Sequence, residues 1–328
     1  MAKIDEKEIQ RILVITLSNV GDIVLTTPVI SALAEEFPQA RIDVMVGPRG
    51  KDVFEKDPRI TKVVIYDKRV SMVKKRRLSL KLKKLRYDLA VDLRNTIFPI
   101  LIGARYRTST IQKFPRTIVH RKHRHLFRLQ CLGIDRMDTA SSIHIPDQDE
   151  KYVDGLLGSA RTSGEIVVVN PGAKSRLKRW TKEGFSSVCD RLINECGSTV
   201  ALVGCDEDRA VVDDIAAMMK REAINLVGKT NVRQLADITR RARLVITNDS
   251  APLHVACAVG TTVLSIFGPT DPKKYGPTGD MDISISKKLF CSPCEKAECR
   301  YDFECMRSIT ADEVFQAAKE MLEGYEIR

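Results

Sequence analysis

The sequence predicts an α/β protein made of two doubly wound halves. Continuous apolar runs rich in Val, Ile and Leu, such as residues 11–17 and 166–169, are typical of strands buried in a parallel sheet. Segments of helical length alternate with these runs along the chain, as βαβ units require. At 328 residues the chain is also long enough for two domains, each with its own core.

The first half follows this alternation from residue 11 to about residue 145. The loop Ser18–Asp22 comes after the first strand, and a helix then runs from Thr26 to about Phe37, with Pro28 in its first turn. The sequence predicts further strands at residues 42–46, 63–66 and 87–92 and a basic helix at residues 74–86.

The second half begins after a linker that we place between residues 145 and 164. We predict an N-terminal domain at residues 1–155 and a C-terminal domain at residues 165–328. A last helix begins at the capping box Thr310–Glu313, ends near Gly324, and is a candidate to pack back on the first domain. The other expected helices are 182–196, 206–220, 232–242 and 251–259, and the other strands are 199–203, 243–246 and 262–267. Ligands bind at the carboxyl ends of such strands, so the expected ligand cleft is the gap between the halves.

The net charge of +11 points to an anionic partner. Between Arg69 and Arg128 the only acids are Asp88 and Asp92. Nucleic acid, an anionic membrane face and a phosphorylated substrate are all compatible with this charge. Nucleic acid is the least favoured, because the basic stretch has few aromatic residues for stacking and no recognised motif. Histidines 120, 123 and 125 have no Cys or acid companion and are expected to join this positive face.

We expect a cytoplasmic location. The N-terminus is charged and lacks the apolar core of an export signal, and no apolar run has the length of a bilayer span. Nine cysteines, an odd count, favour a reducing compartment.

Two strand-to-loop corners of the second half are candidate anion sites. The strand ending at Asn248 leads through Asp249 and Ser250 into the helix 251–259, whose N-terminal amides suit a phosphate. A plain capped βα corner is equally compatible with these residues. The other corner is the basic loop Asn170–Trp180, which lacks the Walker spacing. It contains Gly172, Lys174, Arg176, Lys178 and Arg179. The alternative interpretation of this segment is a solvated basic loop whose tryptophan packs in the core.

Asp22 is the candidate carboxylate of the first half. At the loop after the first strand it is placed to accept a proton from a substrate hydroxyl, and an ordinary N-cap is the more frequent role for such an Asp. Neither half carries a Gly-x-Gly-x-x-Gly fingerprint, which argues against a dehydrogenase. Asp280-Met-Asp282 has the spacing of metal-dependent sugar transferases, but its Pro and Gly neighbours favour a turn.

Four cysteines form a compact C-terminal set. Cys291, Cys294, Cys299 and Cys305 are close enough in sequence for a structural zinc site, although the spacing is not a strong zinc-finger pattern. Free or redox-active thiols are the equally weighted alternative.

Three segments in this order resemble glycosyltransferase family 9, the ADP-heptose:lipopolysaccharide heptosyltransferases. The first is Ser18–Asp22 with Thr26 and Pro28. The second is Asn170-Pro-Gly-Ala173 with Lys178-Arg-Trp180, and the third is Asn248–His254 followed by Phe267-Gly-Pro-Thr-Asp-Pro272. The resemblance implies a GT-B fold with two Rossmann-like domains facing a central cleft. It also implies an inverting, metal-independent transfer of heptose from ADP-heptose to a lipid A–core acceptor, with no cofactor required.

The resemblance implies a role for each matching residue. Asp22 matches the general base, and Lys178 matches the lysine that stabilises the departing diphosphate. The remaining implied donor contacts are Gly172, Lys174, Asp249, Ser250, Ala251 and His254. From their position and charge we add Ser18, Asn19, Thr26, Arg121 and Arg124 as acceptor contacts, and we expect peripheral contact with the inner membrane.

The sequence departs from the family pattern in three places. The Thr residues that some first-heptose transferases use against phosphate are not matched near Ala173 and Lys174. Thr16 replaces a basic residue that some members carry before the first loop, and the acid that holds the adenosine ribose is not identified, although Asn225 lies near its expected position. Another GT-B nucleotide-sugar enzyme, such as an epimerase, is therefore the main alternative function.

Overall fold

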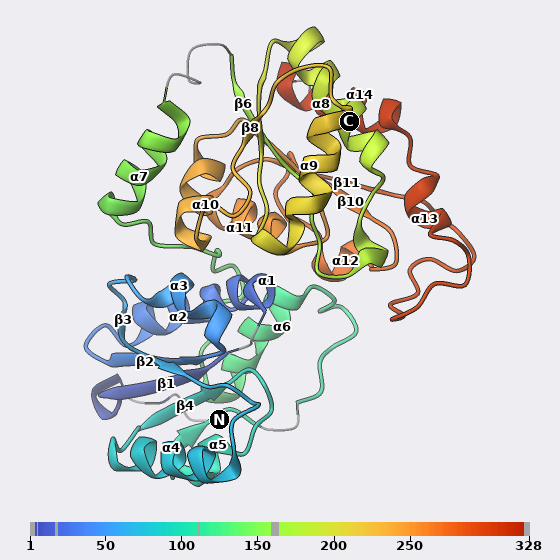
Figure 1. Ribbon diagram of the computed structural model, residues 1–328. Coiled ribbons are helices and arrows are strands. Elements are labelled where there is room, and N and C mark those ends of the chain that lie inside the picture. The colour runs from blue at the N-terminus through green and yellow to red at the C-terminus, as the bar shows by residue number, and fades with distance from the viewer. Residues whose placement is uncertain (1–3, 5, 17–18, 110–111, 159–163, 325–328) are drawn as a thin grey trace. The chain divides into compact units, whose positions relative to one another are not determined.

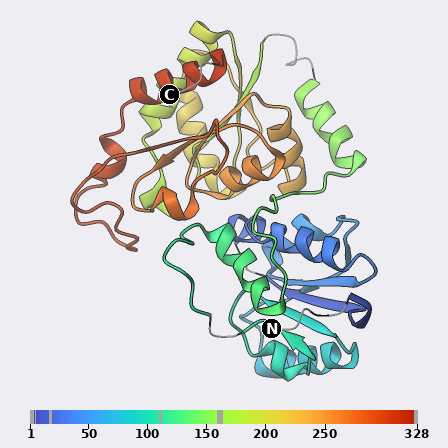
Figure 2. The same ribbon diagram turned by 180° about the vertical axis from the view of Figure 1, so that it is seen from behind.

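The computed structural model describes residues 4, 6–16, 19–109, 112–158 and 164–324. The chain divides into two compact units, Met1–His144 and Ile145–Arg328. Each unit contains one sheet with helices packed against it (Figure 1), and Figure 2 shows the same elements from behind. The two-domain α/β prediction is confirmed.

The sheet of the first unit is parallel and has the order β3-β2-β1-β4-β5. Its central strand β1 is buried from Ile12 to Ile15, as expected for a strand covered on both faces. The strand bounds are β1 Arg11–Ile15, β2 Arg41–Val46, β3 Ile60–Ile65, β4 Leu89–Asp92 and β5 Tyr106–Arg107.

The sequence predicted two helices of the first unit, and the described part of the structure has four more, of which α1 changes the expected loop. Residues Val20–Val24 form the short helix α1, so the expected loop is helical from Val20 onward. The basic helix α4 spans Met72–Lys84 and buries Leu82 against the sheet. The other α-helices of this unit are α2 Thr27–Glu36, α3 Lys51–Phe54, α5 Phe98–Leu101 and α6 Arg121–Phe127, and short 3-10 turns are η1 Glu6–Glu8, η2 Pro48–Gly50 and η3 Arg128–Leu132.

The sheet of the second unit is also parallel, with the order β11-β10-β9-β6-β7-β8. Alternate residues of β6 supply two separate cores. Val167 and Val169 pack with α8 and α14 on one face, and Val168 packs with α7, α10 and α11 on the other. The strand bounds are β6 Ile166–Asn170, β7 Thr199–Leu202, β8 Ile224–Asn225, β9 Leu244–Asn248, β10 Val263–Phe267 and β11 Ile283–Ser286.

Five helices of the second unit lie at the predicted positions, whereas α7, α12 and α13 were not predicted. Helices α8 Lys182–Cys196 and α11 Ala251–Val259 begin and end at the predicted residues, and each is followed by a glycine in the left-handed conformation. The others are α7 Asp147–Leu157, α9 Arg209–Met218, α10 Val232–Arg240, α12 Pro272–Tyr275, α13 Glu304–Arg307 and α14 Ala311–Glu323, with the 3-10 turns η5 Arg176–Lys178 and η6 Asp206–Asp208.

The division between the units falls before the predicted end of the first domain at residue 155. The segment expected to be a linker contains α7, whose Val153 and Leu157 pack in the core under α10. The buried Asp149 also binds Arg233 of α10, with 2.6 Å between Oδ2 and Nε. Burial of these residues therefore assigns α7 to the second unit. The last helix α14 packs on α8 and β9 of that unit.

Two further features concern the turn near β11 and the length of the helices. The turn expected at Asp280-Met-Asp282 is confirmed, because the Asp282 carboxylate accepts the backbone N–H groups of Val263 and Gly279. Among the described helices, none combines the length and the apolar character that crossing a bilayer demands.

Candidate active site

Three loops of the second unit meet at the carboxyl edge of its sheet. Strand β9 lies between β6 and β10, with Asn170 beside Thr247 and Ile266 beside Asn248. The loops that follow these three strands therefore begin side by side. Such an edge, where the chain direction across the sheet reverses, is the usual ligand site of doubly wound sheets.

The side chain of Asp249 connects the loop after β6 with the loop after β10. One of its carboxylate oxygens, Oδ2, accepts a charge-assisted hydrogen bond from Lys178 Nζ and a hydrogen bond from Thr270 Oγ1, each at 2.6 Å. Asp249 is buried, whereas about a third of the Lys178 side chain (30%) is exposed. The ammonium group of Lys178 also lies 5.8 Å from the ring centre of Tyr275. This arrangement holds a cation at the edge with one side open to a ligand.

Asn170 fixes the corner that leads into α11. Its buried side-chain nitrogen Nδ2 lies within hydrogen-bond distance of Gly172 O, Thr247 Oγ1 and Ser250 Oγ, at 2.9–3.0 Å. Ser250 is the N-cap residue of α11, but its side chain makes no capping hydrogen bond. The first-turn amides of α11 are therefore not satisfied by their cap side chain, and the positive end of the helix favours an anion there.

Asn248 and Trp180 hold the basic loop against the end of β9. The Asn248 side chain accepts a hydrogen bond from Trp180 N at 3.0 Å and donates one to Pro171 O at 2.8 Å. The Trp180 indole donates to Ile309 O at 2.9 Å and packs edge-on against Phe185. These contacts limit the movement of Lys178, which lies two residues before the tryptophan.

Gly172 is required by a neighbouring carboxylate. A Cβ atom at this position would lie 2.3 Å from Cγ of Asp208. Asp208 in turn binds Arg179, at 3.2 Å, and Arg179 Nε donates to Ala173 O at 2.8 Å. The sequence attributes this glycine to the approach of a ligand, and the structure shows that the close approach comes from the protein itself.

The other predicted donor residues differ in exposure. Lys174 is exposed, and Ser250 and Ala251 are half-buried at the start of α11. His254 is buried in the same helix, with an exposed fraction of 7%. Most of its side chain is therefore packed inside the unit, and its implied contact with the donor stays a prediction.

Asp22 lies on α1 in the first unit and is half-buried. Its Oδ2 accepts a hydrogen bond from Asn19 Nδ2 at 3.0 Å. Asp22 is in the first turn of α1 but is not the N-cap, because that position belongs to Asn19. The proposed acceptor residue Ser18 falls outside the described residues.

Thr26 cannot serve as an acceptor contact in this structure. It is fully buried, its hydroxyl lies 2.7 Å from the hydroxyl of the buried Thr16, and it donates to Ile23 O at 2.6 Å. The prediction from its position after the first loop is wrong, because the side chain points into the core. Thr16, which replaces a basic residue of the resembled family, is the partner in this buried pair.

The basic helix α6 carries Arg121 and Arg124. Arg121 is exposed, and Arg124 is half-buried, with Nε donating to Ile118 O at 3.0 Å. His125 does not join the positive face as expected. It is buried, and burial together with nearby cations lowers the pKa of its imidazole from 6.5 to about 3.

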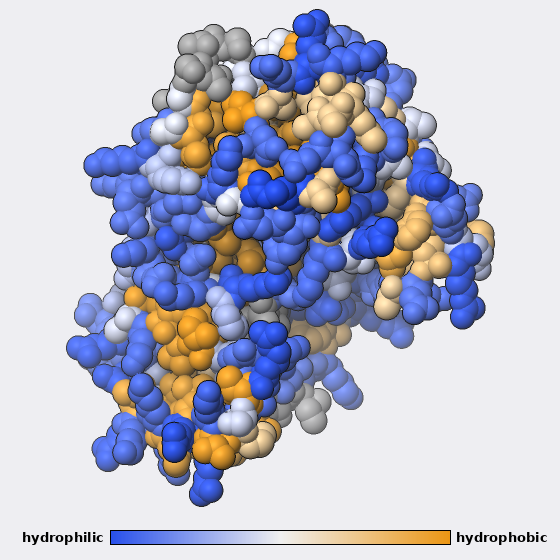
Figure 3. Space-filling view, viewed as in Figure 1, coloured by the Kyte–Doolittle hydropathy of each residue, from blue (hydrophilic) through white to orange (hydrophobic). Residues whose placement is uncertain are grey.

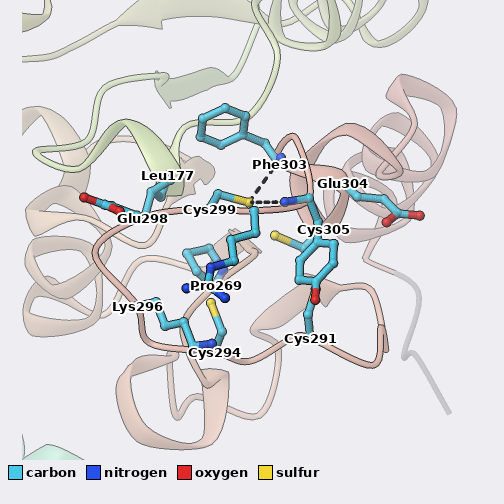
Figure 4. Close-up of a pocket in the computed structure, with 12 residues that line it drawn as sticks. Leu177, Pro269, Cys291, Cys294, Lys296, Glu298, Cys299, Phe303, Glu304 and Cys305 are labelled. Carbon is cyan, nitrogen blue, oxygen red and sulfur yellow. Dashed lines mark hydrogen bonds between the residues drawn. The ribbon is translucent and has the colours of Figure 1, made fainter.

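The four C-terminal cysteines surround one cavity of about 80 Å³ (Figure 4). The cavity is also lined by Leu177, which directly precedes Lys178, and by Pro269, which directly precedes Thr270. Burial, followed by the nearby thiols, raises the pKa of Cys305 above its ordinary value. The donor set suits zinc chemically, but no group of three or more His, Cys, Asp or Glu within the described ranges is arranged to hold a metal ion. All nine cysteines are free of disulfides.

Several residues of this network were not assigned a role from the sequence. Asn170, Thr270 and Asp208 are buried polar side chains that hold the predicted residues in place. Asn170 ends β6 and Thr270 lies three residues after the end of β10, both in segments that the sequence already singles out, so their position at the sheet edge was the available signal. Asp208 follows β7 after an intervening turn, and nothing in its local pattern connects it with Arg179.

The chain matches the family described as glycosyltransferase family 9 (heptosyltransferase) over residues 99–303. Lipopolysaccharide heptosyltransferase 3 of Escherichia coli is 31% identical over 276 residues, which cover 76% of this chain and 81% of that protein.

Two solved structures share the fold. The glycosyl transferase family 9 protein from Veillonella parvula superposes with a TM-score of 0.84 at 22% identity and covers 96% of this chain and 98% of its own. The E. coli ADP-heptose lps heptosyltransferase II has a TM-score of 0.80 at 21% identity and covers 97% of this chain and 100% of its own. These likenesses confirm the expected GT-B fold.

Proposed function

The chain belongs to glycosyltransferase family 9, and we propose that it transfers a heptose from ADP-heptose to the inner core of lipopolysaccharide. The observation that carries this proposal is the carboxyl edge of the second unit, where Lys178 and the N-terminus of α11 offer positive charge on neighbouring loops. A nucleoside diphosphate needs such a site both to bind and to leave.

We assign the donor diphosphate to Lys178 and the first amides of α11. The ammonium group of Lys178 neutralises charge that develops on the β-phosphate as the bond to the sugar breaks, and the helix end adds further stabilisation. These groups belong to the protein, so the proposed transfer is independent of a metal ion. Gly172, Lys174, Ser250 and Ala251 complete the proposed donor site.

Asp249 has a positioning role in this proposal. A carboxylate repels a diphosphate, so direct contact between the two is unfavourable. Its hydrogen bonds to Lys178 and Thr270 instead fix the ammonium group where the diphosphate will lie. Holding a charged group before the reaction avoids the cost of reorganising it during the reaction.

Asp22 is the proposed general base. Its carboxylate accepts the proton of an acceptor hydroxyl, and that oxygen forms a bond to the anomeric carbon of the heptose. The bond from this carbon to the diphosphate oxygen breaks, and ADP departs with the electron pair. A single displacement of this kind inverts the anomeric configuration. Asn19 orients the carboxylate through its 3.0 Å hydrogen bond.

The proposed acceptor is the lipid A–core, and we propose the cytoplasm, at the inner face of the inner membrane, as the place of the reaction. Arg121 and Arg124 on α6 are the proposed contacts to anionic groups of the acceptor. The support is the charge of this helix and the substrate named for the E. coli relative.

A donor panel tests the function. The chain is incubated with ADP-heptose, ADP-glucose or UDP-N-acetylglucosamine, with and without lipopolysaccharide acceptors that carry no, one or two heptoses, in the presence of EDTA. We expect ADP release only with ADP-heptose and an acceptor. Acceptor-independent conversion of a nucleotide sugar into an isomer would instead establish an epimerase, and release that disappears with EDTA would overturn the metal-independent mechanism.

The zinc interpretation of the four cysteines remains a prediction with its own test. Purified protein is analysed for zinc, and free thiols are counted in the native state. One equivalent of zinc that is lost in Cys291→Ser/Cys294→Ser would support a structural ion. A metal-free protein with reactive thiols would support the alternative.

A further inference from the structure

Helices α4 and α5 of the first unit carry a group of exposed apolar side chains among cations. We call this group the α4–α5 surface. It consists of the exposed apolar residues Met72, Val73, Leu80, Ile97, Ile100 and Leu101 and the exposed cations Arg76, Arg77, Lys83 and Lys84. Figure 3 shows apolar and polar surface side by side in the region where Figure 1 draws these helices.

The exposed face of α4 carries apolar side chains as well as cations, although these apolar side chains do not pack in the core. Leu82 is buried in the core, and Leu78 and Leu85 pack around it on the same face. Val73 and Leu80 are two turns apart and share the opposite face with Arg76 and Lys83. Met72 is 75% exposed and Leu80 is 53% exposed. Helical periodicity thus places an apolar stripe directly among positive charges.

Helix α5 continues this surface. Phe98 and Ile102 pack in the same cluster as Leu82, so the buried faces of α4 and α5 are in contact. Ile97, which precedes α5, is 65% exposed, and Ile100 and Leu101 are exposed in the next turn. Exposed apolar groups on two adjoining helices form a patch, and patches of this kind mark interaction sites more often than single residues do.

The charge of α4 is unbalanced. No acid occurs between Asp67 and Asp88 in the sequence. The cations of α4 are Lys74, Lys75, Arg76, Arg77, Lys81, Lys83 and Lys84, and none of them forms an ion pair with an acid in the part of the chain that the structure describes. Seven unpaired cations repel one another, so an anionic partner lowers their energy.

We propose that the α4–α5 surface docks on an anionic lipid bilayer, with the apolar side chains entering the interfacial region and the cations contacting lipid phosphates. A helix with branched apolar residues on one stripe and Lys and Arg beside them is the pattern of interfacial membrane helices. Nucleic acid is disfavoured because the exposed part of this surface is aliphatic and contains no aromatic ring for base stacking. The proposal does not rest on the transfer reaction.

Vesicle binding by the full chain tests this proposal. The protein is sedimented with vesicles of phosphatidylcholine alone or of equal parts phosphatidylcholine and phosphatidylglycerol. We expect binding to the anionic vesicles only, weakened by salt. The variant Leu80→Asp/Ile100→Asp should lose about tenfold or more in partition coefficient, because both apolar anchors become anions. The matched control Met218→Asp/Met281→Asp, which alters two exposed methionines of the second unit, should keep wild-type binding.

Additional measurements test whether the variants are folded and whether nucleic acid competes for the same surface. Thermal melts and transfer to a lipid-free core oligosaccharide should be the same for both double variants and the wild type. Lys83→Glu/Lys84→Glu should weaken anionic-vesicle binding while leaving the melt unchanged. Equal binding to neutral vesicles, full binding by Leu80→Asp/Ile100→Asp, or displacement from vesicles by an RNA oligonucleotide would each overturn the proposal.

Discussion

At the carboxyl edge of the second unit, Asn170, Asn248 and Asp249 are buried and each has at least two hydrogen-bond partners. In the first unit, Asp22 is half-buried and has one partner among the described residues, Asn19. The surroundings of the proposed donor site are therefore held by more hydrogen bonds than the proposed base Asp22 is. A network of buried polar groups fixes its members when their hydrogen bonds are made, as those from Lys178 and Thr270 to Asp249 are.

The difference fits the two proposed substrates. A nucleotide sugar is small and chemically constant, so a preorganised cation and helix end gain from being fixed before it binds. A lipid-linked oligosaccharide is large and varied, and a half-buried base with one described hydrogen-bond partner leaves room for it. The comparison predicts that substitutions in the second unit change both stability and donor binding, whereas Asp22 can be changed with little effect on either.

The largest effect is expected for Asp22→Asn. Loss of the general base should lower the turnover number by about 10²–10⁴-fold. The donor dissociation constant and the melting temperature should stay near wild-type values, because Asn19 is the one hydrogen-bond partner of Asp22 among the described residues. Asn19→Ala is the matched control, which should lower turnover far less because the carboxylate remains. Near-normal turnover by Asp22→Asn would rule out the assigned base.

Lys178→Ala comes next. Removal of one preorganised charge from a leaving group typically lowers kcat by about 10²–10³-fold. Donor affinity should fall as well, in contrast to Asp22→Asn. Lys182→Ala is the control, since Lys182 lies four residues further on and forms an exposed pair with Asp214. A similar loss of kcat in both variants would show that activity depends on the net positive charge of this region and not on the position of Lys178.

Asn248→Ala should act mainly on stability. The substitution leaves Trp180 N and Pro171 O without their partner inside a buried site, which costs about 1–3 kcal/mol of unfolding free energy. Denaturant unfolding measures this change. Asn19→Ala in the first unit should cost well under 1 kcal/mol, because its hydrogen bond is exposed. Equal costs at the two positions would contradict the difference in rigidity.

The last effect, which is small near neutral pH and grows as the pH falls, is an acid sensitivity placed in the first unit. His125 has a folded pKa of about 3, against 6.5 as its ordinary value, because it is buried beside cations. Below pH 6.5 the unfolded chain binds a proton that the folded chain does not, so stability falls as pH falls and stops changing near pH 3. The slope is on the order of 1 kcal/mol per pH unit from this group.

His125→Leu tests this slope. The Nδ1 atom of His125 has no hydrogen-bond partner among the residues that the structure describes, so the apolar replacement should be tolerated at neutral pH. Denaturant unfolding at a series of pH values from 7 to 4 should then show a shallower loss of stability in the variant. Parallel curves for variant and wild type would mean that other groups cause the acid sensitivity.

The order of strands and helices was predictable because periodicity and caps agree along most of the chain. Helix α8 illustrates this, since Thr181 caps its start and Gly197 ends it. Most missed elements, namely the strands β5, β8 and β11 and the helices α1, α3, α5, α12 and α13, have two to five residues and carry too little pattern. The longer helices α6 and α7 were missed as well. The domain boundary was placed too late because the packing of α7 on α10 is a long-range contact.

The sequence identified the charged residues of the candidate site, but it did not predict which of them contact one another. Lys178 and Asp249 stood out as charged residues after strands, but their 2.6 Å pairing depends on strands β6 and β9 being neighbours. The burial of Thr26 and of His125 was missed for the same reason. Local sequence shows a polar residue near a loop, whereas burial depends on which distant elements cover it.

The anomeric configuration of the product tests the account most directly. The chain is incubated in EDTA with ADP-heptose and an inner-core oligosaccharide, and the product is examined by NMR. The account predicts one new heptosyl linkage whose anomeric configuration is opposite to that of the donor. A linkage with retained configuration, or an acceptor that gains no heptose while the protein is folded and the donor intact, would contradict it.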